Sequence, residues 1–266
     1  MELQTKSNLF LVSSGILLLL LGVLLAYLLL PTKKEVVNVE VPAVVVEKID
    51  VSVAPEGYVA PVRTFTTKIT LPEPDTVGTM PVETAIMTRR SAKAYADTPI
   101  TLSQLGQMLW AAQGISNADG KRTSPSRGAV YPITLFVVAD NVNDLEKGLY
   151  QYIPEEHALG LVRSGDLGSN WETITKQTYP KAAPVVVIAS GDMYKQYARY
   201  GDITERLVTQ ETGHIGQNMY LQAQSLGLGM VVLGGFDTEA AHAFLGTEPQ
   251  EKVLYLIPIG NNATEV

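Results

Sequence analysis

An α+β domain preceded by one transmembrane helix is the architecture that this 266-residue sequence predicts. Three observations support this fold class. Residues 9–30 are uncharged and mostly apolar, residues 31–80 are rich in Val, Pro, Glu and Thr without a helical stripe, and beyond residue 80 helical and strand-like patterns alternate. We therefore expect a membrane anchor (9–30), an extended linker (31–80) and one folded domain (81–262).

The apolar stretch over residues 9–30 has the length of a membrane span. At about 1.5 Å per residue, such a helix crosses the roughly 30 Å hydrocarbon core of a bilayer. A cleavable signal peptide has a shorter apolar region and a small-x-small cleavage site, and neither is present before Pro31. We therefore expect an uncleaved single-pass anchor in the lipid bilayer. Its orientation across the membrane stays open, because Lys6 before the span is balanced by Lys33 and Lys34 after it.

Composition excludes several functions. The formal net charge is -7, from 20 Lys and Arg against 27 Asp and Glu, so a nucleic-acid partner is not expected. The absence of cysteine excludes disulfides, iron–sulfur clusters and a cysteine nucleophile. His157, His214 and His242 lack the paired spacing of a metal site, so no metal is expected. We interpret His214 as a partly buried, hydrogen-bonded helix residue, in preference to a catalytic one, because no partner acid or nucleophile is identifiable.

The first half of the domain contains clear start and stop signals. Thr101 and Gln104 have the spacing of a capping box, and Gly114 follows the last apolar position of that stretch, so a helix is expected between them. A short helix is expected at 82–90. Apolar, β-branched runs at 133–140 and 183–190 predict buried strands, and between them residues 148–164 predict a hairpin turning at 154–156.

The second half of the domain is expected to contain a long helix, a strand, a short helix and a final strand. Their predicted ranges are 203–226, 230–233, 237–245 and 252–260. Gly227 fits a glycine that ends the long helix better than a dinucleotide-binding fingerprint, because the fingerprint must follow a strand and open a helix. Gly234 and Gly235 fit equally well a tight turn and a backbone segment lying against a flat ligand.

Three cations surround one serine in the stretch "RRSAKAY". Arg89, Arg90 and Lys93 lie within five positions of one another around Ser91, in an otherwise acidic chain. Cations there could simply complement the dipole at the end of a helix. A phosphate monoester is the alternative, since it carries nearly two negative charges and takes forked donors from Arg and a hydroxyl from Ser. The Gly- and Ser-rich stretch 120–132 likewise fits either a solvent loop or a loop along a polar planar ligand.

Six segments in order carry a family resemblance. They are "RRSAKAY", "LWAAQGI", "RTSPSRGAVYP", "GLYQY" with "EEHAL", "ETGHIGQNMYLQAQSLGLG" and "GGFD". Residues 81–260 thereby resemble the nitroreductase superfamily of flavin enzymes, and within it the SagB-type dehydrogenases related to the azoline oxidases of peptide natural-product biosynthesis. This resemblance implies a three-layer α+β fold in which two subunits interlock and bind FMN at their interface.

The resemblance also implies the residues that bind the cofactor. Those resembling the contacts to the flavin phosphate and ribityl chain are Arg89, Arg90, Ser91 and Lys93. Those resembling the loop along the flavin, which the other subunit contributes in many members, are Pro125, Ser126, Arg127 and Gly128. Those resembling the segment at the flavin ring, where a backbone N–H can donate to N5, are Leu233, Gly234 and Gly235. No catalytic side chain is assigned.

The sequence departs from the family pattern at two places. Lys93 stands where arginine is common, which keeps the charge and loses the forked donors. Asn261 and Asn262 follow the last strand where members often carry Lys or Arg. The first change alters the donor geometry alone, whereas the second removes positive charge from the phosphate site but leaves the cluster at 89–93 intact.

The function implied is that of a membrane-anchored, homodimeric, FMN-dependent oxidoreductase that transfers hydride by a ping-pong cycle. NAD(P)H is the donor in nitroreductases, whereas azoline oxidases use the flavin to aromatise a ring in a peptide, so the substrate is a small molecule or a peptide. A non-catalytic flavin-binding or interaction module on the same fold is the alternative.

Overall fold

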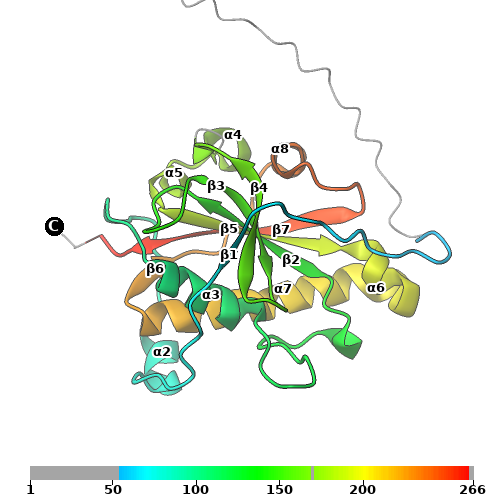
Figure 1. Ribbon diagram of the computed structural model, residues 1–266, viewed down its shortest axis with the longest axis horizontal. Helices are drawn as coiled ribbons and strands as arrows, with labels where there is room; N and C mark the ends of the chain where they lie inside the picture. Colours follow the sequence, from blue (N-terminus) through cyan, green and yellow to red (C-terminus); the bar gives the residue numbers. More distant parts are fainter. Residues whose placement is uncertain (1–53, 169–170, 264–266) are drawn as a thin grey trace, which may run out of the picture. The chain divides into compact units, whose positions relative to one another are not determined.

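A seven-stranded antiparallel sheet forms the centre of the computed structural model, which describes residues 54–168 and 171–263 (Figure 1). The strands are β1 (Lys68–Thr70), β2 (Ile133–Ala139), β3 (Gly148–Ile153), β4 (Ala158–Ser164), β5 (Val185–Asp192), β6 (Leu228–Met230) and β7 (Glu251–Asn261). Their order across the sheet is β1-β4-β3-β2-β5-β7-β6, and neighbouring strands pair antiparallel. The long central strands β2 and β5 are buried on both faces, because helices cover both sides of the sheet.

Helices cover the two faces of the sheet and so form three layers (Figure 1). They are α2 (Val82–Thr88), α3 (Leu102–Gln113), α4 (Trp171–Thr175), α5 (Tyr179–Ala182), α6 (Met193–Tyr200), α7 (Thr204–Ser225) and α8 (Thr238–Leu245). One apolar core lies between the sheet and helices α3 and α7, and the second lies between the sheet and helices α4 and α8. This arrangement confirms the predicted α+β class.

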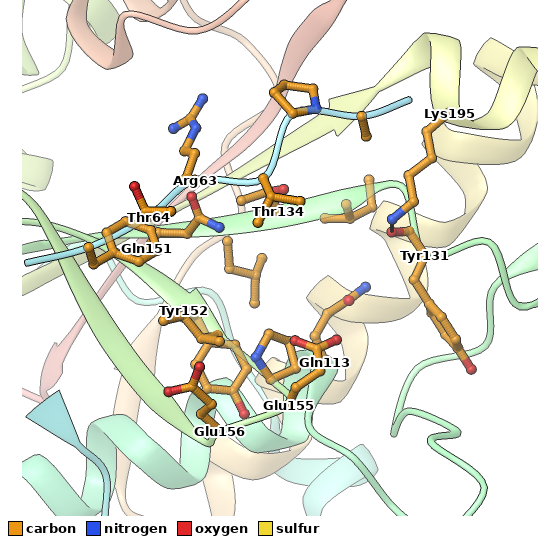
Figure 2. A pocket seen from close by; sticks show the side chains of 18 of the residues that line it. Arg63, Thr64, Gln113, Tyr131, Thr134, Gln151, Tyr152, Glu155, Glu156 and Lys195 are labelled. Atoms are coloured by element: carbon orange, nitrogen blue, oxygen red, sulfur yellow. Dashed lines mark hydrogen bonds between the residues drawn. The ribbon is translucent and has the colours of Figure 1, made fainter. Parts of the chain in front are cut away.

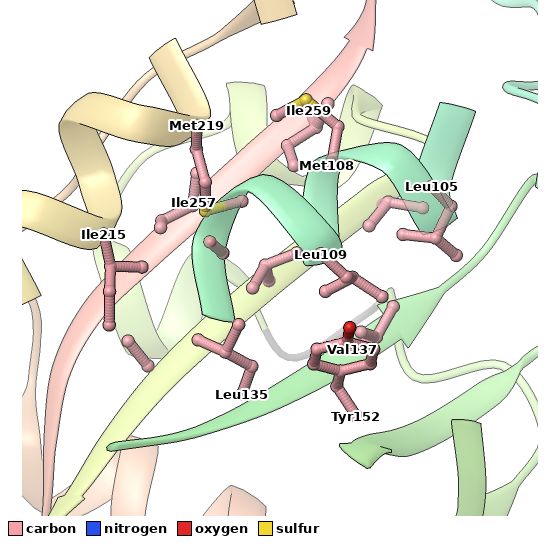
Figure 3. Close-up of a cluster of buried hydrophobic side chains, with 14 of the residues drawn as sticks. Leu105, Met108, Leu109, Leu135, Val137, Tyr152, Ile215, Met219, Ile257 and Ile259 are labelled. Carbon is pink, nitrogen blue, oxygen red and sulfur yellow. The ribbon is translucent and has the colours of Figure 1, made fainter. Parts of the chain in front are cut away.

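The larger core follows from the apolar spacing of α3 and α7 (Figure 3). Met108 and Leu109 follow Leu105 by three and four positions, so the three side chains form one face of α3. All three are fully buried against the sheet. Ile215 and Met219 do the same from α7. The two helices are thereby fixed on one face of the sheet.

The start and stop signals of α3 are confirmed. The Thr101 hydroxyl accepts a hydrogen bond from the Gln104 backbone N–H at 3.1 Å, and the Gln104 side chain accepts one from the Thr101 N–H at 2.9 Å. The helix ends at Gly114, which is its C-cap. The hairpin of β3 and β4, the long helix α7 and the capped helix α8 also match their predicted ranges within a few residues.

Several elements differ from the sequence-based expectation, and helices α4 and α5 are among those that were not predicted. The strand expected at 230–233 is instead β6 at 228–230, although the Val231 and Leu233 N–H groups still donate to Pro258 and Leu256 of β7. Helix α6 was not predicted, although Asp192 caps its first turn by accepting from the Lys195 N–H at 3.1 Å and Gly201 ends it. Its single apolar stripe is short, which is why periodicity alone did not reveal it.

Residues 54–67, which we call the strap, lie against the sheet. The Tyr58 hydroxyl donates to the Asp192 carboxylate at 2.8 Å, and Arg63 forms an ion pair with Glu251 at 2.9 Å. Phe65 packs so closely on Gly160 that an added Cβ would meet its ring at 2.3 Å. The described part of the predicted linker is therefore held by the folded domain, and it continues into β1, an edge strand of the sheet.

The predicted membrane localisation is wrong. Within residues 54–168 and 171–263, no helix combines the length and the apolar composition that a membrane span needs. Residues 9–30, to which the span was assigned, lie outside the described residues.

Candidate active site

The cationic stretch 89–95 leaves helix α2 and runs beside β6. Arg89 is the C-cap of α2, so the helix ends one residue before the cluster and does not include it. The Ala92 N–H donates to the Met230 carbonyl at 2.9 Å, and Tyr95 bridges to Asn262. This pairing fixes the backbone of the stretch at the edge of the sheet.

The three cations among the four predicted phosphate-contact residues are not paired with described carboxylates. Arg90, Ser91 and Lys93 are exposed and Arg89 is partly exposed. Within the described part of the chain, no Asp or Glu forms an ion pair with Arg89, Arg90 or Lys93. Like charges this close repel one another, so their positive potential is available to an anion.

Tyr220 of α7 connects the cationic stretch to the segment after β6. The Arg89 guanidinium lies over the Tyr220 ring at 5.0 Å, and the Ser91 and Tyr220 hydroxyls are 2.9 Å apart. The same Tyr220 hydroxyl accepts from the Val232 N–H. The structure therefore joins the segment 89–93 to Val232, directly before the segment 233–235, through one tyrosine hydroxyl.

The segment Leu233–Gly235 presents open backbone. Leu233 rejoins the sheet by hydrogen bonds to Leu256, whereas Gly234 and Gly235 are exposed. Neither glycine has a positive φ, and an added Cβ would meet nothing closer than 3.6 Å at Gly234 and nothing within 4 Å at Gly235. Neither backbone strain nor crowding from the described residues requires glycine there, so both interpretations, a tight turn and a segment against a flat ligand, stay open.

The third predicted segment, Pro125–Gly128, has a constrained shape. Gly128 is left-handed with a φ of 66°, and an added Cβ would lie 2.2 Å from the Tyr200 hydroxyl. The Gly128 carbonyl accepts from Arg199 at 3.1 Å, and the Arg127 guanidinium lies over the Tyr200 ring at 5.6 Å. Helix α6 thus determines the course of the loop.

Glu211 holds this loop from α7. It is 3 % exposed, and it accepts hydrogen bonds from Ser126 and Gln113. Burial raises the pKa of Glu211, while the two hydrogen bonds and the charge of Arg122 oppose that rise. The sequence analysis missed Glu211, although a carboxylate on the same helical stripe as Val208 and Ile215 is a detectable signal.

The loop and the cationic stretch contact different parts of α7. Ser126 is held at Glu211, whereas Ser91 and Arg89 are held at Tyr220. Nine residues of helix separate these anchors, which corresponds to about 13 Å along the axis. The loop nevertheless begins close to Tyr220, because the Asn218 side chain donates to the Ser124 hydroxyl at 3.0 Å, so it runs along α7 from Asn218 to Glu211.

Three further residues correct or complete the predictions. His214 is exposed on α7, so its interpretation as a partly buried residue is wrong. Asn261 and Asn262 direct their side-chain amides to the protein itself: Asn261 donates to Thr98 and Pro99, and Asn262 donates to the Gly227 carbonyl. Neither asparagine replaces the missing charge near the cationic stretch.

Comparison with known sequences decides the family. The sequence model of the nitroreductase family matches residues 86–261. A protein of Methanocaldococcus jannaschii named as a nitroreductase is 35 % identical over 196 residues, which are 73 % of this chain and 96 % of that protein. The chain belongs to the nitroreductase family. Members of this family are FMN-dependent, and the chain is accordingly a nitroreductase-family oxidoreductase.

Solved structures agree with this assignment. A nitroreductase-family structure from Ralstonia eutropha is 29 % identical, covers 77 % of this chain and 93 % of its own, and superposes with a TM-score of 0.65. A chain of the microcin synthetase McbBCD complex of E. coli is 19 % identical, covers 79 % and 85 % of the two chains, and has a TM-score of 0.59. The second likeness establishes a shared nitroreductase fold and nothing further.

The residues present fit the cofactor of the nitroreductase family. The phosphate of FMN needs cations and hydroxyl or N–H donors that are not already neutralised. Arg89, Arg90, Ser91 and Lys93 supply this donor set at the surface, and no described carboxylate pairs with the three cations. The chemistry of the donor set is therefore that of a phosphate site.

Proposed function

We propose that this chain is an FMN-dependent oxidoreductase whose phosphate site is formed by Arg89, Arg90, Ser91 and Lys93. The observation that carries the proposal is the unneutralised cationic stretch, joined through Tyr220 to the open backbone of Leu233–Gly235. When bound, FMN would supply two-electron redox chemistry that no side chain of this protein can provide.

The protein's own residues would bind and orient the cofactor. The guanidinium groups offer forked donors and Lys93 a point charge, while the Tyr220 hydroxyl keeps Ser91 in place. Exposed N–H groups of Gly234 and Gly235 can stabilise charge that develops near them, because backbone donors fixed in direction need no reorganisation.

We also propose that the active form is a homodimer in which a second copy supplies the loop Pro125–Gly128. The family resemblance of residues 125–128 supports this arrangement, because the other subunit contributes this loop in many members of the family. Helix α2 adds an exposed apolar surface directly before the cationic stretch, with Val82, Ile86 and Met87 exposed by 54 %, 56 % and 70 %. A second copy of the chain would cover this surface.

Within the family, we place the chain among the SagB-type dehydrogenases and expect a ping-pong cycle. The six ordered sequence segments support the subfamily. In such a cycle, donor and acceptor use the same exposed face in turn, which suits the single open segment at Leu233–Gly235. NADH or NADPH is the expected donor, and an organic molecule or a peptide is the expected partner in the second half of the cycle.

The proposal is tested by recording the absorption spectrum of bound flavin and then following its reduction. Full-length protein purified with added FMN should retain a flavin absorption band after gel filtration and should scatter light as a dimer. Rapid mixing with NADH or NADPH under anaerobic conditions should bleach the band, which would establish the reductase direction. Bound flavin that neither nicotinamide reduces would instead favour the azoline-oxidase direction, and protein that retains no flavin would contradict the proposal.

A further inference from the structure

An open pocket lies between the strap and the sheet, apart from the proposed flavin residues (Figure 2). Its volume is about 940 Å³, which is the size of a small-molecule site. Strap residues 58–65 form one wall, and the other wall comes from the start of β2, the end of β3 and the turn that follows it. None of its described lining residues belongs to the stretches 89–93, 125–128 or 233–235.

Two cations meet at this pocket on either side of Tyr131. The Arg122 guanidinium lies 4.7 Å from the centre of the Tyr131 ring, and the Lys195 ammonium donates to the Tyr131 carbonyl at 3.0 Å. The side chain of Arg122 is only 11 % exposed, whereas Lys195 is exposed, with its ammonium directed to Tyr131 (Figure 2). Burial, followed by the charge of Arg122, lowers the pKa of Lys195.

The described carboxylates neutralise these cations incompletely. Arg122 pairs with Glu155 at 2.7 Å, and Glu155 is a turn residue whose side chain is 63 % exposed. The other terminal nitrogen of the Arg122 guanidinium donates to the Gln113 side chain. In the described residues no carboxylate forms an ion pair with Lys195, although the charges of Asp192, Glu155 and Glu211 act on it from farther away. Burial disfavours the charged form of Glu211. An anion entering the pocket would therefore relieve the repulsion between two like charges.

The remaining walls combine apolar side chains with polar ones such as Thr64, Thr134 and Gln151. Pro61, Val62 and Phe65 line the pocket from the strap, and Ile133 and Leu135 line it from β2. The strap is held in place by the ion pair between Arg63 and Glu251 and by Tyr58.

We propose that the pocket binds a small organic carboxylate, with the carboxylate group between Arg122 and Lys195 and the apolar body against the strap and β2. The chemistry follows from forked donors beside a point charge, together with an apolar wall. The proposal is independent of flavin binding, since the pocket shares no residue with the proposed flavin site.

Calorimetry with benzoate and benzamide tests the ligand class. These probes have the same shape and differ in charge, so full-length protein with added FMN should bind benzoate about tenfold more tightly than benzamide, as a lost charged hydrogen bond implies. Lys195→Met should remove most of this preference, and Lys195→Arg should keep it. Lys147→Met is the control, because Lys147 lies outside the pocket and pairs with Asp140 and Asp166.

A gain of affinity provides a second test. Glu155→Gln should tighten benzoate binding about threefold to tenfold, because it removes the negative charge that competes with the ligand for Arg122. Glu172→Gln changes the net charge equally but lies outside the pocket, where Glu172 pairs with Lys181 at 3.9 Å, so its effect should be clearly smaller. Equal gains in the two variants would show a general charge effect and would contradict the assignment to Arg122.

The flavin spectrum separates the pocket from the flavin face. Benzoate in the pocket should leave the absorption band of bound FMN unchanged. The proposal would be overturned by absence of benzoate binding, by equal affinities for benzoate and benzamide, or by binding that perturbs the band and ignores the changes at Lys195 and Glu155. Protein that binds no FMN but keeps the benzoate preference would contradict the proposed function alone.

Discussion

The cations at residues 89–93 and the guanidinium of Arg122 lie in opposite surroundings. Arg89, Arg90 and Lys93 are wholly or partly exposed, and no described carboxylate pairs with them. Arg122 is largely buried, and its contacts come from Gln113 on α3, Glu155 on the turn after β3 and Tyr131. Substitution of the first group should reduce the stability of the fold little, and its charges are available to a ligand. Arg122, in contrast, also holds three parts of the chain together.

Replacing Arg122 should give the largest loss of stability. Arg122→Met removes charged hydrogen bonds to Gln113 and Glu155 and leaves Lys195 as the remaining cation near buried Glu211, so the free energy of unfolding should fall by about 2–3 kcal/mol. Arg90→Ala, at an exposed position, should change it by no more than about 0.5 kcal/mol. Urea denaturation of the two variants measures this difference, and equal losses would refute the contrast.

Tyr220→Phe should have an intermediate effect. The change deletes the hydroxyl shared by Ser91 and the Val232 N–H, and each lost hydrogen bond is worth about 1 kcal/mol, so the unfolding free energy should drop by about 1–2 kcal/mol. FMN affinity should also fall, because Ser91 and the segment after β6 lose their common anchor. Thermal unfolding and flavin titration give the two values. An unchanged FMN affinity would mean that Tyr220 supports the fold only.

His157 should make a smaller, pH-dependent contribution. Its Nε2–H donates to the Pro72 carbonyl at 3.0 Å and its Nδ1 accepts from the Tyr152 hydroxyl at 2.9 Å, an arrangement of the neutral ring. Burial lowers the pKa of His157 below its ordinary value near 6.5. The unfolded chain therefore binds the proton more readily, so stability is full above about pH 6.5 and decreases as the pH falls through that value.

His157→Asn should remove this part of the pH dependence, and Asn tolerates the φ of 43° at that position. The informative quantity is the difference in unfolding free energy between wild type and variant, measured at about pH 7.5 and about pH 5. It should be larger at the higher pH. The exposed His214→Asn serves as the control, and a difference independent of pH would contradict the assignment.

Local signals predicted more of this fold than long-range contacts did. The capping box at Thr101 and the glycine at 114 determine α3 within the segment itself, so its ends were predictable. The strap, a Val- and Pro-rich stretch, is instead positioned by partners more than a hundred residues away, including Asp192 and Glu251. No periodicity in the strap's own sequence carries that information.

The same distinction applies to the candidate site. The cations at 89–93 are adjacent in sequence, so their clustering was visible before the structure. Tyr220, which connects them to Leu233–Gly235, and Glu211, which holds the loop at Ser126, act through tertiary contacts on α7. A tyrosine or a glutamate on a long helix has no distinguishing local pattern unless it falls on the apolar stripe, as Glu211 does.

The most direct test of the central claim compares FMN and riboflavin binding to wild type and Arg89→Ala. If the cationic stretch binds the phosphate, the substitution should weaken FMN by about 1.5–3 kcal/mol, roughly ten- to a hundredfold, while Lys93→Arg largely preserves binding. Riboflavin lacks the phosphate, so it should bind wild type weakly and lose little further affinity in the Arg89 variant. Equal losses for FMN and riboflavin would contradict the account, because Arg89 would then support the fold through Tyr220 without contacting the phosphate.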